Sequence, residues 1–341
     1  MSNHSDTFAT VGIDIAKNVF QVYACNSQTG EITNESVRRN QLLKLFENRK
    51  PCLIGMEACG GSQYWARELT KLGHAVRLMD GKLVKPFVSR NKSDRADAEG
   101  IHAALAAGVR TVAVRDGTEC DIHTLLTMRQ RLVNERMTNI NHVRGLLLEY
   151  GVAIDKSTSR FDKQVDEGIN GLEGRVSQLV VEQLRATVSG IRSGSRRIAD
   201  LTAGIANLAR RTKHANNLLT VPGVGVVTMA YMSVLLADPK VYESARQFAA
   251  FLGLVPMHWG SGGKTITTHI PGRCNKRLRA LLVECANAVA RSRKKTPWVE
   301  KILKSKPRKV ALIAIANRIA RQCWAVADKS QPWRMITPAT A

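Results

Sequence analysis

The feature that most restricts the fold is the order of strand and helix signals before about Val114. Apolar, β-rich segments alternate with helical segments. Gly73 and Gly108 stand just past two of the helical segments, where glycine commonly ends a helix. We predict strands at 8–15, 19–24, 31–37, 52–56 and 75–79, and helices at 41–46, 63–72 and 94–107. The chain therefore begins with an α/β domain.

Three strands, a helix, and then strand, helix, strand and helix is the order of a ribonuclease H-like domain. Such a sheet gathers residues from different strands and one late helix at a single edge. After about Glu119 the strand signals fade, and apolar residues recur at helical spacing along 132–147 and 198–208. Gly151 and the polar stretch 155–164 suggest a break between two helices. This pattern predicts a helical hairpin or coiled coil that spaces two domains or joins two protomers.

The middle helices carry many basic residues: Arg129, Arg131, Arg136, Arg144, Arg192, Arg196, Arg197, Arg210 and Arg211. A solvated charged face is the more frequent explanation of such a pattern, and we favour it. A path for nucleic acid is the alternative.

The final third, from Asn216, is compact again and mainly helical. An apolar helix follows the turn at 219–225, a glycine-rich turn lies at 260–263, and two strongly basic helical stretches come after it. The fold class is therefore α/β plus all-α. The expected domains are a ribonuclease H-like α/β domain at 1–115, a helical coiled-coil region at 116–215, a C-terminal domain at 216–330, and a tail at 331–341.

The charge indicates a polyanionic partner. Lys and Arg number 51 against 28 Asp and Glu, which gives a net charge of +23. Neutralising phosphates releases counterions and drives association, although ribosomal or membrane-surface proteins can be as basic. No run approaches the roughly 20 apolar residues of a spanning helix, and the seven cysteines form no C-x-x-C pair. We expect a reduced, cytoplasmic protein.

Four acidic residues stand where metal ligands would be useful. Asp14 lies inside an apolar strand, where an unpaired charge is costly, and Glu57 ends another. Gly60 and Gly61 follow Glu57 and would let backbone approach a metal ion or phosphate. Asp94 and Asp97 share one face at the start of a helix, where two carboxylates repel unless a cation lies between them.

Each acid alone has an ordinary explanation, a strand end or a helix cap. Together, the four are what two hard cations need for phosphodiester chemistry, with the metal ions roughly 3.5–4 Å apart. Oxygen ligands favour Mg²⁺, or Mn²⁺, over zinc.

Nucleic-acid contacts are expected mainly from the basic helices near the C-terminus, where few aromatic residues interleave for base stacking. The Pro-Gly-Val-Gly turn at 222–225 is typical of a helix-hairpin-helix, whose glycine amides contact phosphates; a tight turn without a ligand fits equally well. The predicted contacts are Lys17, Lys92, Gly223, Gly225, Lys264, Arg273, Lys276, Arg277, Arg279, Arg293, Lys294 and Lys309.

The acidic segments resemble the motifs of the DEDD transposases. They read Gly12-Ile-Asp-Ile-Ala-Lys17, Gly55-Met-Glu-Ala-Cys-Gly60 and Asn91-Lys-Ser-Asp-Arg-Ala-Asp97. These transposases are insertion-sequence enzymes with a RuvC-like N-terminal domain, related to Piv-type DNA invertases. The resemblance continues at 221–225, 245–256 and 260–262, so it covers both ends of the chain in the right order.

The resemblance implies a second catalytic element, a serine in a Ser-Gly step after a Gly-Leu-x-Pro motif, which is Ser261 here. Its hydroxyl would attack a DNA phosphodiester and form a covalent phosphoserine intermediate, assisted by metal ions on the acidic residues. Gly263 departs from the family, whose members often carry another small polar residue there. From the residues alone, Ser261 would only shape a turn.

The resemblance also implies a prokaryotic protein that associates with the nucleoid when active, and it implies the partners. These are double-stranded donor and target DNA, a structured noncoding guide (bridge) RNA that base-pairs with both, and further copies of the chain in a dimer or tetramer. Subunits could then share a site, with the serine of one chain beside the acids of another.

Two other classes of function stay open. A Holliday-junction-type endonuclease needs the four acids but no serine. A noncatalytic nucleic-acid-binding protein would use the acids only as caps. The length beyond about residue 115 favours the transposase, because a resolvase domain would already be complete.

Overall fold

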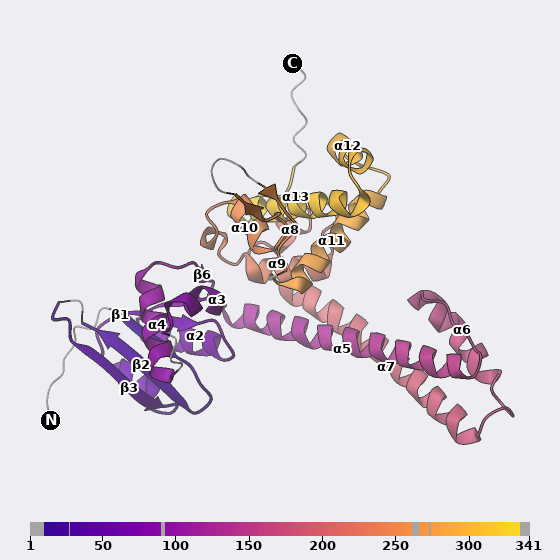
Figure 1. Ribbon diagram of the computed structural model, residues 1–341, viewed down its shortest axis with the longest axis horizontal. Helices are drawn as coiled ribbons and strands as arrows, with labels where there is room; N and C mark the ends of the chain where they lie inside the picture. The colour runs from indigo at the N-terminus through magenta and orange to yellow at the C-terminus, as the bar shows by residue number, and fades with distance from the viewer. Residues whose placement is uncertain (1–9, 27, 90–92, 261–265, 273, 335–341) are drawn as a thin grey trace, which may run out of the picture. The chain divides into compact units, whose positions relative to one another are not determined.

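The computed structural model describes residues 10–26, 28–89, 93–260, 266–272 and 274–334 (Figure 1). The chain divides into two compact units. The described residues of 1–120, 235–274 and 320–330 form the first unit, and those of 121–234, 275–319 and 331–341 form the second.

The first unit contains a six-stranded mixed sheet with the strand order β3-β2-β1-β4-β5-β6. Its strands are β1 (Thr10–Asp14), β2 (Val19–Cys25), β3 (Ile32–Arg38), β4 (Leu53–Glu57), β5 (Ala75–Met79) and β6 (Thr111–Val112). The first three strands are antiparallel, β4 and β5 run parallel to β1, and β6 is antiparallel to β5. This arrangement is consistent with the ribonuclease H-like fold that the element order predicts.

Helices lie between and beside these strands, at α1 (Leu42–Glu47), α2 (Ser62–Lys71), α3 (Gly81–Val84), η1 (Lys85–Phe87) and α4 (Asp94–Ala106). Every strand and helix expected before residue 108 is present, with ends displaced by a few residues at most. The sequence patterns missed α3, η1 and β6. Elements of two to four residues are too short to show a period.

Alternate residues of β1 face opposite sides of the sheet, as the pleat requires. Val11 and Ile13 join the core cluster that includes residues of α1 and α2, such as Phe46 and Trp65. Their neighbours along the strand face α4 on the other side, where Thr10 Oγ1 lies 2.8 Å from His102 Nε2. The side chain of Asp14 is therefore on the α4 side of the sheet.

The rest of the first unit comes from later in the chain. It contains η2 (Pro239–Val241), α10 (Ala245–Phe251), the two-stranded ribbon of β7 (His258–Trp259) and β8 (Ile266–Thr267), and the last part of α13 (Arg308–Asp328). Tyr242 packs against the rings of Phe248 and Phe251, and Trp324 donates to the carbonyl oxygen of Pro239 at 3.0 Å. The segment is thus tied to the end of α13.

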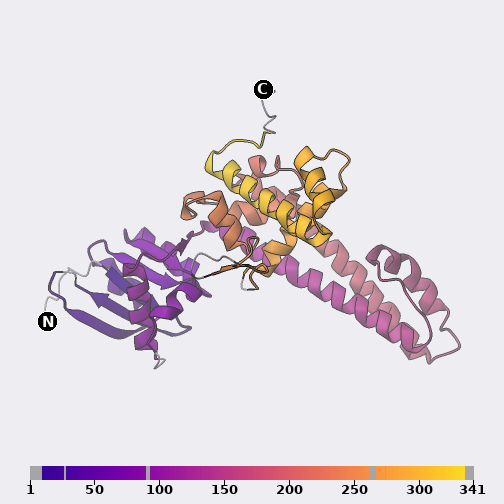
Figure 2. The same cartoon turned by 45° about the horizontal axis from the view of Figure 1, so that its top comes forward.

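The second unit is helical throughout its described part. Its helices are α5 (Gly117–Glu149), α6 (Thr158–Asn170), α7 (Gln178–Ala209), α8 (Ala215–Leu218), α9 (Val226–Leu235), α11 (Lys276–Arg291), α12 (Pro297–Ser305) and the start of α13. The long helices α5 and α7 run side by side in both views (Figure 2). Arg129 of α5 donates to Thr202 of α7 at 2.7 Å.

The expected break at 155–164 is partly wrong. The turn after Gly151 exists, but α6 starts at Thr158. Its buried residues Phe161, Val165 and Ile169 recur every four positions and pack in one cluster with residues of α5 and α7. The helix was missed because only every fourth residue is apolar and the residues between are mostly polar or charged, which is the sequence pattern of a helix with a narrow buried face.

One described helix, α13, is long and apolar enough to cross a membrane by length and composition. A core helix of a soluble protein passes the same test, and half of the apolar stretch is buried in this protein. Arg318 and Arg321 on the same helix are exposed. The helix therefore has the features of a core element.

Candidate metal centre

Three of the four predicted acids meet beside the sheet. One carboxylate oxygen from each of Asp14, Asp94 and Asp97 lies within 4.8 Å of the others. Asp14 ends β1, while Asp94 and Asp97 occupy the first turn of α4. Asp14 and Asp97 are half-buried and Asp94 is exposed. The strand and the helix start thus meet as the sequence predicts.

Gly12 explains why α4 comes so close to β1. A Cβ at Gly12 would collide with the carbonyl oxygen of Ala98 and lie 2.7 Å from the backbone nitrogen of His102. Gly55 pairs with Gly12 across β1 and β4, and a Cβ there would lie 3.1 Å from the side chain of Leu105. The two adjacent glycines therefore make room for the helix on the sheet.

Polar and aromatic contacts fix the position of α4 along the sheet. His102 bonds to Thr10 and stacks on Tyr23, with 5.0 Å between ring centroids. Asn34 of β3 donates to the carbonyl oxygen of Arg95 at 3.2 Å, and Ser93 caps the helix by accepting from Ala96. The first turn of α4, with both aspartates, is therefore held against β1 rather than free to move.

Crowding of the carboxylates changes the acidity of Asp14. Burial, and then the negative charges of Asp97, Asp94 and Glu57, raise the pKa of Asp14 from 3.8 to about 6. Carboxylates brought this close repel one another unless a cation or a proton lies between them. The site thus favours a bound cation.

Glu57 lies at the end of β4, next to β1, and is not one of the three clustered acids. Its carboxylate rests on the backbone of Gly81, where a Cβ would collide with Oε1. Its charge still contributes to the raised pKa of Asp14. The sheet therefore brings Glu57 to the same region, in an outer position.

The donors of the site are all carboxylate oxygens, a set that suits Mg²⁺ or Mn²⁺. Asp14, Asp94 and Asp97 can share one ion, and Glu57 extends the donor set on one side. An ion there would stabilise negative charge on oxygen atoms of a phosphodiester.

The glycines after Glu57 lie in a turn with open space beside them. Gly61 has a φ of 90°, in the left-handed region that favours glycine, and precedes α2. A Cβ at Gly60 or Gly61 would have no atom within 4 Å. The positive φ explains Gly61 as a requirement of the turn, and the approach of a metal ion or phosphate to these two glycines stays a prediction.

The remaining predicted residues fall into two groups. Ser261, Lys92, Lys264 and Arg273 lie outside the described residues. Among the others, Lys17, Lys276, Arg293, Lys294 and Lys309 are exposed, whereas Arg277 and Arg279 are half-buried. Exposed cations are available to a polyanion, and the nucleic-acid contacts stay predictions.

The turn at 222–225 is a tight helix connection between α8 and α9. Gly223 has a φ of 84°, and a Cβ there would lie 2.7 Å from the carbonyl oxygen of Cys285 in α11. Packing against α11 is therefore sufficient to explain Gly223. Gly225 has open space around its Cβ position.

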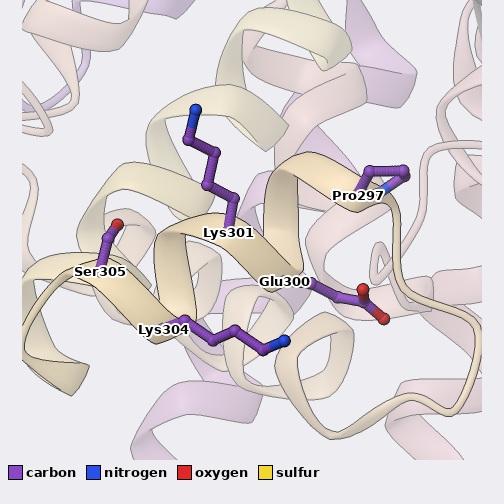
Figure 3. Close-up of a pocket in the computed structure, with 5 residues that line it drawn as sticks. All are labelled: Pro297, Glu300, Lys301, Lys304 and Ser305. Atoms are coloured by element: carbon purple, nitrogen blue, oxygen red, sulfur yellow. The ribbon is translucent and has the colours of Figure 1, made fainter.

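A surface hollow on α12 is a weaker candidate for a site (Figure 3). Lys301 and Ser305 point to one side of the helix, while Glu300 and Lys304 point to the other. Side chains that diverge from a single helix do not converge on a ligand, so no function is assigned to this hollow.

Sequence reasoning missed the residues that position the acids. His102 and Thr10 carry no metal-binding pattern, and their pairing spans 92 residues. Gly12 gave a usable signal, because glycine inside an apolar strand often marks close backbone contact.

Comparison with known proteins places these features in a family. A DEDD-type model of the IS110 class, described as "Transposase", matches residues 11–152, and a model described as "Transposase IS116/IS110/IS902 family" matches residues 215–303. The chain is 33% identical to a "Probable family 20 transposase" of Pseudomonas aeruginosa, over 95% of this chain and 98% of the relative. It is 31% identical to the "Transposase for insertion sequence element IS1111A" of Coxiella burnetii, over 95% and 91%. A "Pilin gene-inverting protein" of Moraxella bovis is 30% identical over 43% of this chain and 48% of the relative.

Proposed function

Because the chain belongs to the IS116/IS110/IS902 family of insertion-sequence transposases, a class of DNA-cleaving and rejoining enzymes, we propose that it uses a composite site of metal ions and a serine. Asp14, Glu57, Asp94 and Asp97 hold divalent cations, two Mg²⁺ or Mn²⁺ ions in the full complex. Ser261 is the nucleophile.

The observation that carries the proposal is the meeting of Asp14, Asp94 and Asp97 within 4.8 Å. Caps on separate elements have no need to converge, yet close packing at Gly12 brings these carboxylates together. The raised pKa of Asp14 supports the same assignment, because bound cations would offset the burial and the neighbouring negative charges that raise it.

The chemistry proposed for Ser261 is a transesterification. Its Oγ forms a bond to phosphorus, the bond from phosphorus to a sugar oxygen breaks, and that oxygen leaves as a DNA hydroxyl. A DNA hydroxyl later attacks the phosphoserine, which reseals a strand and releases the serine. The bond energy is conserved in the phosphoester, so no nucleotide cofactor is consumed.

The test is a search for the covalent intermediate. The complete element with its native flanks recombines in cells, protein–DNA adducts are trapped and digested, and mass spectrometry locates the linked residue. We expect an adduct on Ser261 that is absent from Asp14→Asn and unchanged in Ser292→Ala, a matched serine variant. Cleavage without an adduct, unaffected by Ser261→Ala, would instead indicate a water-driven, resolvase-like nuclease.

The proposal includes a structured noncoding guide RNA. Its support is the family resemblance of the motifs. Sequencing RNA that copurifies with the protein, expressed from its whole element, should return one RNA encoded beside the gene. Recovery of only bulk cellular RNA would remove the guide from the proposal.

We also propose a dimer or tetramer in which subunits share sites. The proposed domain limits are 1–115 for the catalytic domain, 116–215 for the helical region, 216–330 for the serine-bearing domain and 331–341 for the tail. Mixing Asp14→Asn with Ser261→Ala subunits should restore part of the recombination if the acids and the serine come from different protomers. No recovery would place both in one chain.

A further inference from the structure

A polar groove of about 690 Å³ lies in the second unit, away from the acidic residues in sequence. One side is a stretch of α5 that includes Thr127, Gln130 and Asn134, and the other is made by Tyr231 of α9 and by Asn275 and Arg277 at the start of α11. These side chains offer amide, hydroxyl and guanidinium groups. The groove is therefore suited to a polar ligand rather than an apolar one.

Arg277 lines the groove, and two further guanidinium groups, those of Arg129 and Arg136, add positive charge near it without lining it. Burial, and then the positive charge of Arg277, lower the pKa of Arg129, and Arg136 also contributes. Arg129 donates to Thr202 of α7, which holds it in place. Glu284 is also close enough to offset part of the charge. Like charges gathered and partly buried in this way are costly unless an anion neutralises them.

Some donor and acceptor atoms near the groove have no hydrogen-bond partner. The Nε atoms of Arg136 and Arg277 are buried without a partner among the described residues, and so is Oε1 of Gln130. Buried polar atoms are rarely left unsatisfied in a folded protein. The Nε of Arg277 therefore has no partner inside the protein, next to the groove that this side chain lines.

The start of α11 adds to the positive character of the groove. This helix has 16 residues, and its N-cap Asn275 accepts from the backbone of Leu278 at 3.1 Å. Its positive dipole end therefore lies beside the guanidinium of Arg277. The carboxylate in the lining, Glu135, is already paired with Arg131 at 2.9 Å. An anion would thus meet mostly donors.

We propose that this groove binds the phosphodiester backbone of a nucleic-acid duplex. Guanidinium forks and amide donors match phosphate oxygens, and backbone contact needs no base sequence. The middle arginines Arg129 and Arg136 then add positive charge beside this binding surface, rather than forming only the solvated face that the sequence pattern favoured. The inference rests on the proposed function, because DNA and a guide RNA both supply this backbone.

The test is equilibrium binding of the full-length protein to labelled 30-base-pair duplexes by fluorescence anisotropy. EDTA prevents cleavage, and the salt concentration is varied. Arg277→Gln should weaken binding about tenfold and reduce the slope of log K against log salt by about one. Asn134→Asp, an exposed position, should weaken it comparably by placing a carboxylate against phosphate. Arg210→Gln removes the same charge from an exposed position outside the groove and should change affinity by less than twofold.

Duplex DNA and duplex RNA are tested separately. Weaker binding of one or of both supports the groove and names its ligand. Unchanged affinity for both in Asn134→Asp and Arg277→Gln, or equal weakening in Arg210→Gln, would overturn it. Asp14→Asn separates the two proposals: it should abolish recombination while leaving duplex binding intact. Recombination by Asp14→Asn would contradict the proposed composite site but not the proposed groove.

Discussion

The molecule gathers like charges in two places by opposite means. Beside the sheet of the first unit, three short aspartates are fixed by close backbone packing between α4 and Gly12. Beside the groove of the second unit, arginines from α5 and α11, whose side chains are long and flexible, lie close enough for their charges to interact. The position of a carboxylate on a short side chain is set by the backbone, whereas the long side chain of arginine can adjust its conformation to reach a partner.

The difference separates two kinds of requirement. A metal ion needs ligand oxygens within a few tenths of an ångström, so the acidic cluster should fail sharply when one ligand or its support changes. A phosphate backbone accepts many arrangements of donors, so the groove should weaken in graded steps and with salt. The predictions below test this difference in tolerance between the acidic cluster and the groove.

The largest effect should come from a single ligand. Asp97→Asn keeps the shape of the side chain and removes its charge, so recombination in cells should fall on the order of 10³-fold. Duplex binding in EDTA should stay within twofold of the wild type. A variant that keeps a tenth of the activity would show that the cluster is as tolerant as the groove.

Gly12→Ala tests the packing that brings the ligands together. Its Cβ would meet backbone atoms of α4, which must move away from β1. We expect a loss of about 3 kcal/mol in the free energy of unfolding in urea, and loss of Mn²⁺ binding by calorimetry. Gly60→Ala, which places a Cβ in open space, is the matched control and should cost less than about 0.5 kcal/mol. Equal stability of the two variants would contradict this role of Gly12.

Gly81→Ala should have a smaller and more selective effect. Its Cβ would meet the far end of the Glu57 side chain, which can rotate away. The free energy of unfolding should therefore change little, while recombination falls about tenfold because Glu57 is displaced. Unchanged recombination would remove Glu57 from the catalytic set and leave the three clustered aspartates.

The smallest effect should be the pH dependence caused by Asp14. Its pKa is raised from 3.8 to about 6, so between these values the metal-free folded protein binds more protons than the unfolded chain. Stability contributed by this group therefore falls as the pH rises through that window. Asp14→Asn should remove the fall and stabilise the metal-free protein at pH 7 by about 1 kcal/mol, since solvent screens a half-exposed carboxylate. Urea unfolding in EDTA at pH 4 and pH 7 measures it. If the free energy of unfolding of Asp14→Asn changed between pH 4 and pH 7 as much as that of the wild type, Asp14 would not be the cause of the pH dependence.

Most elements of the first unit could be predicted because local patterns specify them. The period of two in β1 and the glycine after α2 each act within a few residues. The short β6 and the helix α6 escaped, the first because two residues show no period and the second because its buried stripe is narrow. Ser261 was identified by resemblance alone, and it stays a prediction.

The sequence by itself determined the composition of both charged regions, the order of elements and the positions of the four acids along them. Only the tertiary structure decided that Asp14, Asp94 and Asp97 meet while Glu57 stays outside the group. It also decided that Arg129, Arg136 and Arg277 gather instead of facing water separately. The physical reason is that periodicity reports which face of an element is buried. How closely two such faces approach is not a local property. It depends on contacts between residues far apart in the chain, such as that of Gly12 with Ala98.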